Sequence, residues 1–184
     1  MSPKRNKPTN CFYAWYSTYF AMDMISKALH VPKSKLIEKA CELYLSEEWL
    51  SETKIEDNGV PGSASVVSYT ISKEYTEKID EIMEKLGLSR SKIINAILVQ
   101  FLKQITRVLP LLKKNTLGTD DQGNYLFSVE NLKCEVPFDQ NPELMKKIKK
   151  IFYNDKKKPT IILLQKRSKW ELALYLAIEC NPSG

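Results

Sequence analysis

The chain carries one sequence pattern twice, and this internal repeat constrains its fold more than any other feature. The segment PKSKLIEKACELYL (residues 32–45) aligns without a gap with SRSKIINAILVQFL (residues 89–102) at an offset of 57 residues. The same offset pairs Phe12 with Tyr69, Met22 with Ile79, Asp23 with Asp80, Ile25 with Ile82 and Leu45 with Leu102. A register kept over more than thirty positions is not a chance match. The repeat therefore indicates one structural unit that occurs twice.

The second copy predicts a short strand, a helix, a tight turn and a longer helix. Residues 66–71 are rich in β-branched side chains and alternate, so that Val67, Tyr69 and Ile71 face one way. The first helix ends at Gly87, because glycine is the usual residue just past a helix end. The pattern also predicts N-caps at Ser72 and Ser89 and an apolar face of the longer helix made of Ile93, Ile94, Ile97, Leu98, Phe101 and Ile105.

Neither copy is expected to be stable alone. One strand and two helices cannot bury both apolar faces, and a single strand leaves its backbone groups unpaired. The connector from Ser46 to about Ala64 is long enough to cross a small domain, so the copies can pair within one polypeptide. Fusion of the two copies removes the concentration dependence of their pairing.

The order of strand, helix and GLSRSKIINAIL (residues 87–98) resembles the ribbon-helix-helix (MetJ/Arc-like) family of DNA-binding proteins. In that family two strands pair as an antiparallel ribbon that lies in the major groove of DNA, with four interlocked helices beneath it. The resemblance implies an α+β fold: a tandem ribbon-helix-helix pseudo-dimer with an intramolecular two-stranded ribbon and four helices, followed by a small C-terminal α/β extension. The expected DNA-binding domain is 1–110, with unit one at about 9–47, a linker at 48–63 and unit two at about 64–107, and the extension is 111–184.

The resemblance implies that outward side chains of the ribbon contact base edges. Alternation along the strands, transferred by the offset, gives Thr9, Cys11 and Tyr13 in the first copy and Val66, Ser68 and Thr70 in the second. Hydroxyl groups can bond to any base edge, and the methyl groups of threonine and valine can meet a thymine methyl. The alternative interpretation is an ordinary solvated sheet face.

The resemblance also implies that the start of each second helix holds the DNA backbone, because a helix N-terminus suits a phosphate. The candidate phosphate contacts are Lys33, Ser34 and Lys35 in the first copy, Ser89, Arg90, Ser91 and Lys92 in the second, and a basic arm of Lys4, Arg5 and Lys7. Pro32 stands where the second copy has Ser89, so the first copy lacks that side-chain cap. The arm could follow phosphates or enter a minor groove, or it is a solubilising tail.

The two ribbon strands differ in character. The first carries Tyr13, Trp15 and Tyr16, whereas the second is small and polar. A homodimer binds a palindrome because of its symmetry, and this chain has no such symmetry. The sequence therefore predicts an asymmetric DNA site.

The region beyond residue 110 does not resemble a known family. It predicts a turn at 120–123, strands at 125–129, 133–138 and 160–164, a basic helix at 141–153 that contains Lys146, Lys147, Lys149 and Lys150, and a last helix opened by Ser168-Lys169-Trp170-Glu171. Its lysines either extend the DNA footprint or form a solvated face. The region is also a candidate for self-association on DNA or for binding an effector.

Composition excludes several classes of protein. The net charge of +6 favours a polyanionic partner, and no stretch is apolar enough to cross a membrane. With a single histidine, His30, in a turn position equivalent to Gly87, we expect no catalytic triad and no enzyme activity. The four cysteines form no CxxC pair, so we expect no metal site, no cofactor and reduced thiols in a cytoplasmic protein, or in the host cytoplasm if the chain is viral.

The function that these features predict is a sequence-specific double-stranded DNA-binding transcription regulator that represses or activates by occupying promoter DNA. The fused pair of units and the many Lys, Ile and Tyr residues are similar to regulators carried by archaeal viruses. One alternative is an architectural protein that coats DNA with little sequence preference. Another is an antitoxin-like protein-interaction module.

Overall fold

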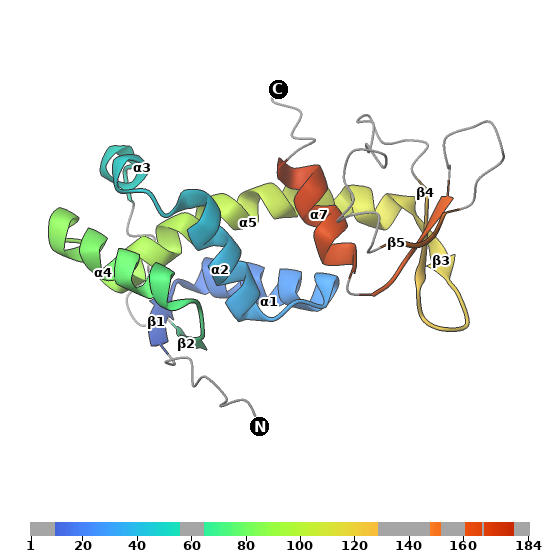
Figure 1. Cartoon of the computed structure of the whole chain (residues 1–184), viewed down its shortest axis with the longest axis horizontal. Coiled ribbons are helices and arrows are strands. Elements are labelled where there is room, and N and C mark those ends of the chain that lie inside the picture. The colour runs from blue at the N-terminus through green and yellow to red at the C-terminus, as the bar shows by residue number, and fades with distance from the viewer. Residues whose placement is uncertain (1–9, 56–64, 129–147, 152–160, 167, 179–184) are drawn as a thin grey trace. The chain divides into compact units, whose positions relative to one another are not determined.

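The computed structural model describes residues 10–55, 65–128, 148–151, 161–166 and 168–178, and over these the chain is α+β (Figure 1). The elements are β1 (Asn10–Ala14), α1 (Tyr16–Leu29), α2 (Lys33–Tyr44), α3 (Glu47–Glu52), β2 (Ser65–Tyr69), α4 (Lys73–Leu86), α5 (Arg90–Asn115), β3 (Thr116–Thr119), β4 (Tyr125–Ser128), β5 (Ile148–Ile151), β6 (Ile161–Leu164) and α7 (Ser168–Ile178). The chain divides into two compact units, Met1–Lys27 with Val31–Lys103 and Ala28–His30 with Gln104–Gly184.

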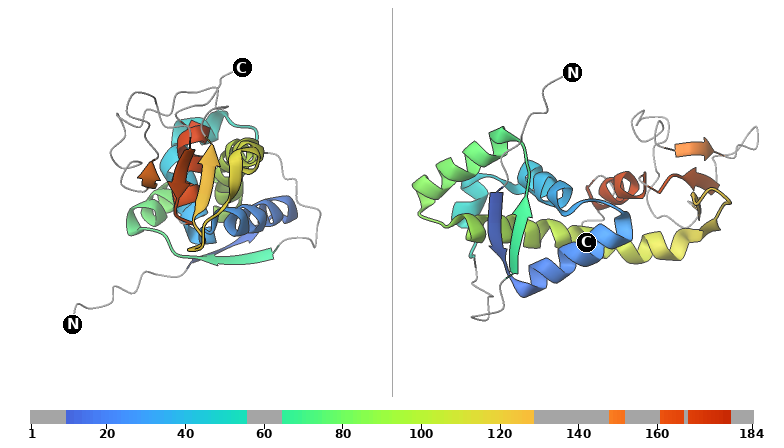
Figure 2. Two further views of the ribbon diagram at one scale, coloured as in Figure 1. Left: turned by 90° about the vertical axis from the view of Figure 1, so that its right-hand side faces the viewer. Right: turned by 90° about the horizontal axis from the view of Figure 1, so that it is seen from below.

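Unit 1 contains a two-stranded antiparallel sheet formed by β1 and β2, which lie side by side in Figure 2. The strands alternate as predicted, with Phe12, Val67 and Tyr69 buried. The rings of Phe12 and Tyr69 pack edge to face, with their centroids 5.7 Å apart. The inner face of this ribbon is therefore part of the core of unit 1.

The repeat is visible in the core, because residues at the offset of 57 are buried together. The pairs buried in both copies include Phe12/Tyr69, Ala14/Ile71, Met22/Ile79, Ile25/Ile82, Leu36/Ile93, Ile37/Ile94, Ala40/Ile97 and Cys41/Leu98. The predicted apolar face of the longer helix is confirmed, since its six residues are all fully buried. Each copy thus contributes the same positions to one shared core.

Both copies turn between their helices in the same way. Gly87 ends α4 in the left-handed conformation, at φ 63°, and its N–H donates to the carbonyl of Met83. His30, the equivalent residue after α1, has φ 53°. Histidine adopts a positive φ less readily than glycine, so the positive φ of His30 reflects the turn that both copies share. The predicted turn role of His30 is confirmed.

Two features of unit 1 differ from expectation. The connector predicted for 48–63 starts with a helix, α3, whose N-cap Ser46 accepts a hydrogen bond from the backbone N–H of Trp49. Ser72 does occupy the N-cap position of α4, but its hydroxyl makes no capping hydrogen bond, so that part of the prediction is wrong. Ser89 caps α5 as predicted by accepting from the N–H of Lys92.

Unit 2 holds a four-stranded antiparallel sheet in the order β3-β4-β6-β5. The predicted turn is confirmed, because the Asp120 carboxylate accepts hydrogen bonds from the N–H groups of Gln122 and Asn124. The strands predicted at 125–129 and 160–164 appear as β4 and β6, and α7 begins at Ser168 as predicted. The strand predicted at 133–138 lies outside the described residues.

The helix predicted for 141–153 is wrong over 148–151, which form β5 along one edge of β6. Lysine-rich sequence favours a helix only weakly, and the strand pairing available at the edge of β6 outweighs that preference. The rest of the predicted helix lies outside the described residues. Within this part of the chain α5 continues through Pro110, the predicted domain boundary, as far as Asn115.

The two described cysteines should differ in reactivity. Cys11 is exposed on β1, whereas burial raises the pKa of the Cys41 thiol to about 12. The thiolate of Cys41 is then on the order of a thousandfold scarcer than that of an ordinary cysteine near neutral pH. We expect iodoacetamide at pH 8 to modify Cys11 in the folded chain and Cys41 only after denaturation, as measured by peptide mass mapping. Equal modification of both in the folded chain would contradict the described packing.

Candidate nucleic-acid interface

The pairing of β1 with β2 relates the two copies as a twofold axis would. Cys11 pairs with Ser68, and these two residues are equivalent in the repeat, since 68 − 11 = 57. The neighbouring pairs Asn10 with Tyr69 and Phe12 with Val67 exchange places under the same offset. The centre of the ribbon therefore lies between Cys11 and Ser68, and equivalent residues lie at equal distances on either side.

The outer face of the ribbon presents four of the six predicted base contacts. Cys11, Tyr13, Val66 and Ser68 are exposed and form two cross-strand pairs, Cys11 with Ser68 and Tyr13 with Val66. Thr70 follows β2 and is half-buried, and Thr9 lies outside the described residues. The structure thus places these side chains on one face, but not all of them are equally exposed there.

Two equivalent serines join the starts of α2 and α5 to the ribbon. The Ser91 hydroxyl accepts a hydrogen bond from the backbone N–H of Tyr13 at 3.0 Å, and the Ser34 hydroxyl accepts one from the N–H of Thr70 at 3.2 Å. Tyr13 and Thr70 are themselves equivalent in the repeat. Each serine therefore holds the strand of the other copy, and the predicted phosphate contacts Ser34 and Ser91 already have partners in the protein.

Asn95 makes a further connection for which the described residues of the first copy show no counterpart. It is fully buried, its Oδ1 accepts from the N–H of Trp15 at 3.0 Å, and its Nδ2 donates to the carbonyls of Tyr13 and Ser91 at 2.8 Å each. The equivalent residue is Glu38, which is half-buried. The backbone at Tyr13 is therefore held at both its N–H and its carbonyl, whereas at Thr70 the described side-chain bond is the one from the N–H to Ser34.

The first basic residue of each second helix is paired with an aspartate. Lys33 Nζ lies 2.9 Å from Asp23, and Arg90 lies 2.7 Å from Asp80, and these two ion pairs are equivalent in the repeat. The hydrogen bond to Asp23 raises the pKa of the Lys33 ammonium. Two hydrogen bonds lower the pKa of the Asp23 carboxyl, and the one from Lys27 has a larger effect than the one from Lys33. Both cations are thus held against the first helix of their own copy.

The remaining predicted phosphate contacts fall into three groups. Lys35 and Lys92 are exposed and follow the ribbon-bonded serines Ser34 and Ser91 directly, so one lysine lies near each end of the ribbon. Ser89 is exposed and caps α5. The basic arm Lys4, Arg5 and Lys7 lies outside the described residues.

Asn95 and the two aspartates were missed by the sequence analysis. Asn95 lies within a run of apolar residues, where a buried amide needs partners that only the folded chain reveals. The aspartates did carry a signal, because Asp23 and Asp80 are identical at equivalent positions.

The outer faces of the two first helices differ strongly. Tyr16, Phe20 and Met24 of α1 are exposed and follow one another at helical spacing, and the rings of Tyr16 and Phe20 stack. The equivalent residues of α4 are Lys73, Glu77 and Glu81, all exposed, with Lys73 and Glu77 in an ion pair. The two copies thus share a core but not a surface.

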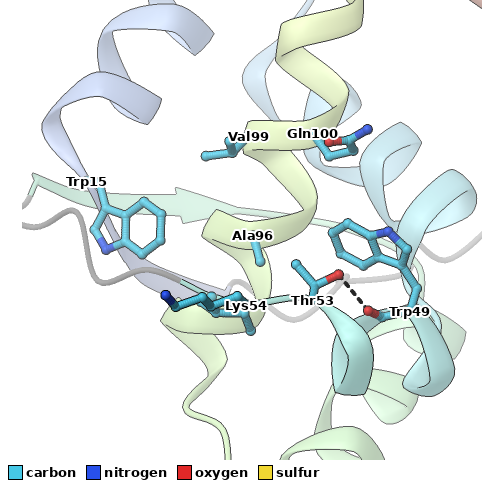
Figure 3. Close-up of a pocket in the computed structure, with 8 residues that line it drawn as sticks. Trp15, Trp49, Thr53, Lys54, Ala96, Val99 and Gln100 are labelled. Carbon is cyan, nitrogen blue, oxygen red and sulfur yellow. Dashed lines mark hydrogen bonds between the residues drawn. The ribbon is translucent and has the colours of Figure 1, made fainter.

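A hollow of about 180 Å³ lies beside α5 in unit 1, with the indole rings of Trp15 and Trp49 on opposite sides of Ala96 (Figure 3). The Thr53 hydroxyl near its rim donates to the carbonyl of Trp49 at 2.6 Å. The residue equivalent to Trp15 in the second copy is Ser72, so this aromatic wall is not repeated there. Lys54 is the one titratable residue among those that line it.

The described residues also bear on two other kinds of site. No group of three or more His, Cys, Asp or Glu side chains there is arranged to hold a metal ion. None of the described helices is both long enough and apolar enough to span a membrane.

Comparison of the chain with protein-family models, with curated proteins and with solved structures gives no match.

Asn95→Ala should destabilise the chain by about 2–3 kcal/mol, because it leaves the buried N–H of Trp15 and the carbonyl of Tyr13 without their partner. The matched control is Glu38→Ala at the equivalent position, where we expect a change within about 0.5 kcal/mol. Urea unfolding followed by circular dichroism measures both. A loss below about 1 kcal/mol for Asn95→Ala would show that these hydrogen bonds are not a main constraint on β1.

Proposed function

We propose that the chain is a sequence-specific double-stranded DNA-binding protein of the tandem ribbon-helix-helix kind, which places the β1–β2 ribbon in the major groove and regulates transcription. The observation that carries this proposal is the joint arrangement of ribbon and helices. The outer face of the ribbon is exposed, and the Ser34 and Ser91 hydroxyls, at the starts of α2 and α5, accept hydrogen bonds from the backbone N–H groups of Thr70 and Tyr13. An exposed lysine follows each of these serines.

The size of the ribbon supports the proposal. Paired strands lie about 4.8 Å apart, and the major groove, about 12 Å wide, admits a two-stranded ribbon with its side chains. The exposed residues at its centre, Cys11 and Ser68, are small, so the middle of the ribbon can approach the base edges closely.

The charge distribution supports a contact with both DNA strands. Lys35 and Lys92 lie in the first turns of α2 and α5, where the helix dipole adds to their positive charge. With the ribbon in the groove, the two helix starts on either side of its centre would meet the phosphates of opposite groove walls. Lys33 and Arg90 would add positive charge near this contact while they remain in their ion pairs with Asp23 and Asp80.

The specificity of the proposed site is asymmetric. The ribbon has a twofold register, but Tyr13 and Thr70 occupy equivalent positions with different side chains. The two halves of the bound DNA would therefore meet different chemical surfaces and need not be related by symmetry.

The double variant Lys35→Ala with Lys92→Ala should weaken binding to every duplex by a similar factor and make the salt dependence less steep. Two lost phosphate contacts lower the magnitude of the slope of log K against log salt concentration by about 1.8. The control is Lys103→Ala, an exposed lysine about 16 Å further along α5. Fluorescence anisotropy over a salt series measures the slopes, and an unchanged slope in the double variant would contradict the proposed docking.

Selection of bound sequences from random duplex DNA tests sequence specificity. A regulator should prefer its selected site over random DNA by at least about 10³ at physiological salt. A much smaller preference would favour the architectural alternative. Absence of duplex binding at low salt would overturn the proposal.

A further inference from the structure

One end of the exposed ribbon face is apolar. Tyr13 and Val66 pair across the strands, and their exposed fractions are 61% and 60%. The central pair beside them, Cys11 with Ser68, is smaller, and Thr70 beyond the centre is half-buried and carries a hydroxyl. The ribbon therefore presents a large apolar side chain pair on one side of its centre and a polar residue at the equivalent place on the other.

The apolar end is also the more firmly held. The backbone of Tyr13 bonds to Ser91 through its N–H and to Asn95 through its carbonyl, and Asn95 also fixes the N–H of Trp15. A side chain on a fixed backbone loses less conformational entropy when it meets a partner. The structure thus combines exposed apolar area with a preorganised backbone at the Tyr13–Val66 end of the ribbon.

From this arrangement we infer that the Tyr13–Val66 pair recognises the 5-methyl groups of thymines in one half of the DNA site. The inference rests on the proposed function, because it names what the same ribbon face would contact. In the major groove the thymine methyl is the apolar group that distinguishes one base edge from the others. The phenol ring of Tyr13 and the two methyls of Val66 can cover such groups, whereas water covers them in free DNA.

The expected size of the effect follows from the size of a methyl group. Removal of one buried methyl changes affinity by about fourfold. Replacing thymine with uracil removes the methyl and keeps the hydrogen-bonding edge of the base. We therefore expect losses of about fourfold at one or two thymines, all on one side of the site centre, and little effect on the other side.

The experiment uses the full chain and the duplex that it selects from random DNA. Each thymine is replaced in turn by uracil, and affinities are measured by fluorescence anisotropy. Tyr13→Ala and Val66→Ala should bind the thymine and uracil duplexes almost equally at the affected positions. Tyr13→Phe should keep the thymine preference, because the ring and not the hydroxyl covers the methyl. Circular dichroism checks that each variant folds, which their exposure favours.

Phe20→Ala is the matched control, since Phe20 is an equally exposed aromatic residue that lies on α1 and not on the ribbon, and it should keep the thymine preference. Two results would overturn the inference while leaving the proposed function intact. One is tight duplex binding that no uracil replacement weakens, and the other is a thymine preference that survives in both alanine variants. If the chain binds no duplex at all, the proposed function fails and this inference fails with it.

Discussion

The backbone pairing of β1 with β2 is the interaction on which unit 1 depends. Each strand is five residues long, and within the described sheet each has only the other as a neighbour. The pairing joins Cys11 to its own equivalent, Ser68, and so determines how the two copies face each other. With that register set, Ser34 and Ser91 can each reach the strand of the opposite copy. The attachment of α2 and α5 to the ribbon and the set of residues on its exposed face are therefore both consistent with this one strand register.

The symmetry set by the ribbon is broken in a consistent way. Buried positions remain apolar in both copies, as in Met22 with Ile79 and Leu36 with Ile93. Differences occur where side chains leave the core, as in Tyr13 against Thr70 and Phe20 against Glu77. Changes in the core are destabilising, because an altered volume disturbs the packing of both copies at once. Substitutions on the surface usually change stability little, so those positions are constrained mainly by what they contact. The proposed function uses this division, with a symmetric scaffold that carries an asymmetric surface.

Much of this arrangement could be predicted from the sequence because it depends on local periodicity. Alternation along 66–71 identified the buried face of β2. Gly87 marked the end of α4, and His30 has the same left-handed conformation after α1. The bonds that attach the helices to the ribbon could not be predicted, because Ser91 and Tyr13 are 78 residues apart and a serine at a helix start suits capping equally well. The strand at 148–151 was missed because its edge pairing with β6 is not a local property. The helix α3 carried a recognisable signal, Ser46 followed by two glutamates, within a segment interpreted as a linker.

The ribbon register has a consequence for how such a protein can evolve. In a dimer of identical chains, one mutation changes both members of every symmetric pair on the ribbon. Here Cys11 and Ser68 occupy the same structural position but are encoded separately, so each can mutate without the other. A gene of this kind can explore one half of its exposed face while the other half keeps its established contacts. In the fused repeat, the two members of each symmetric pair on the ribbon can therefore change independently.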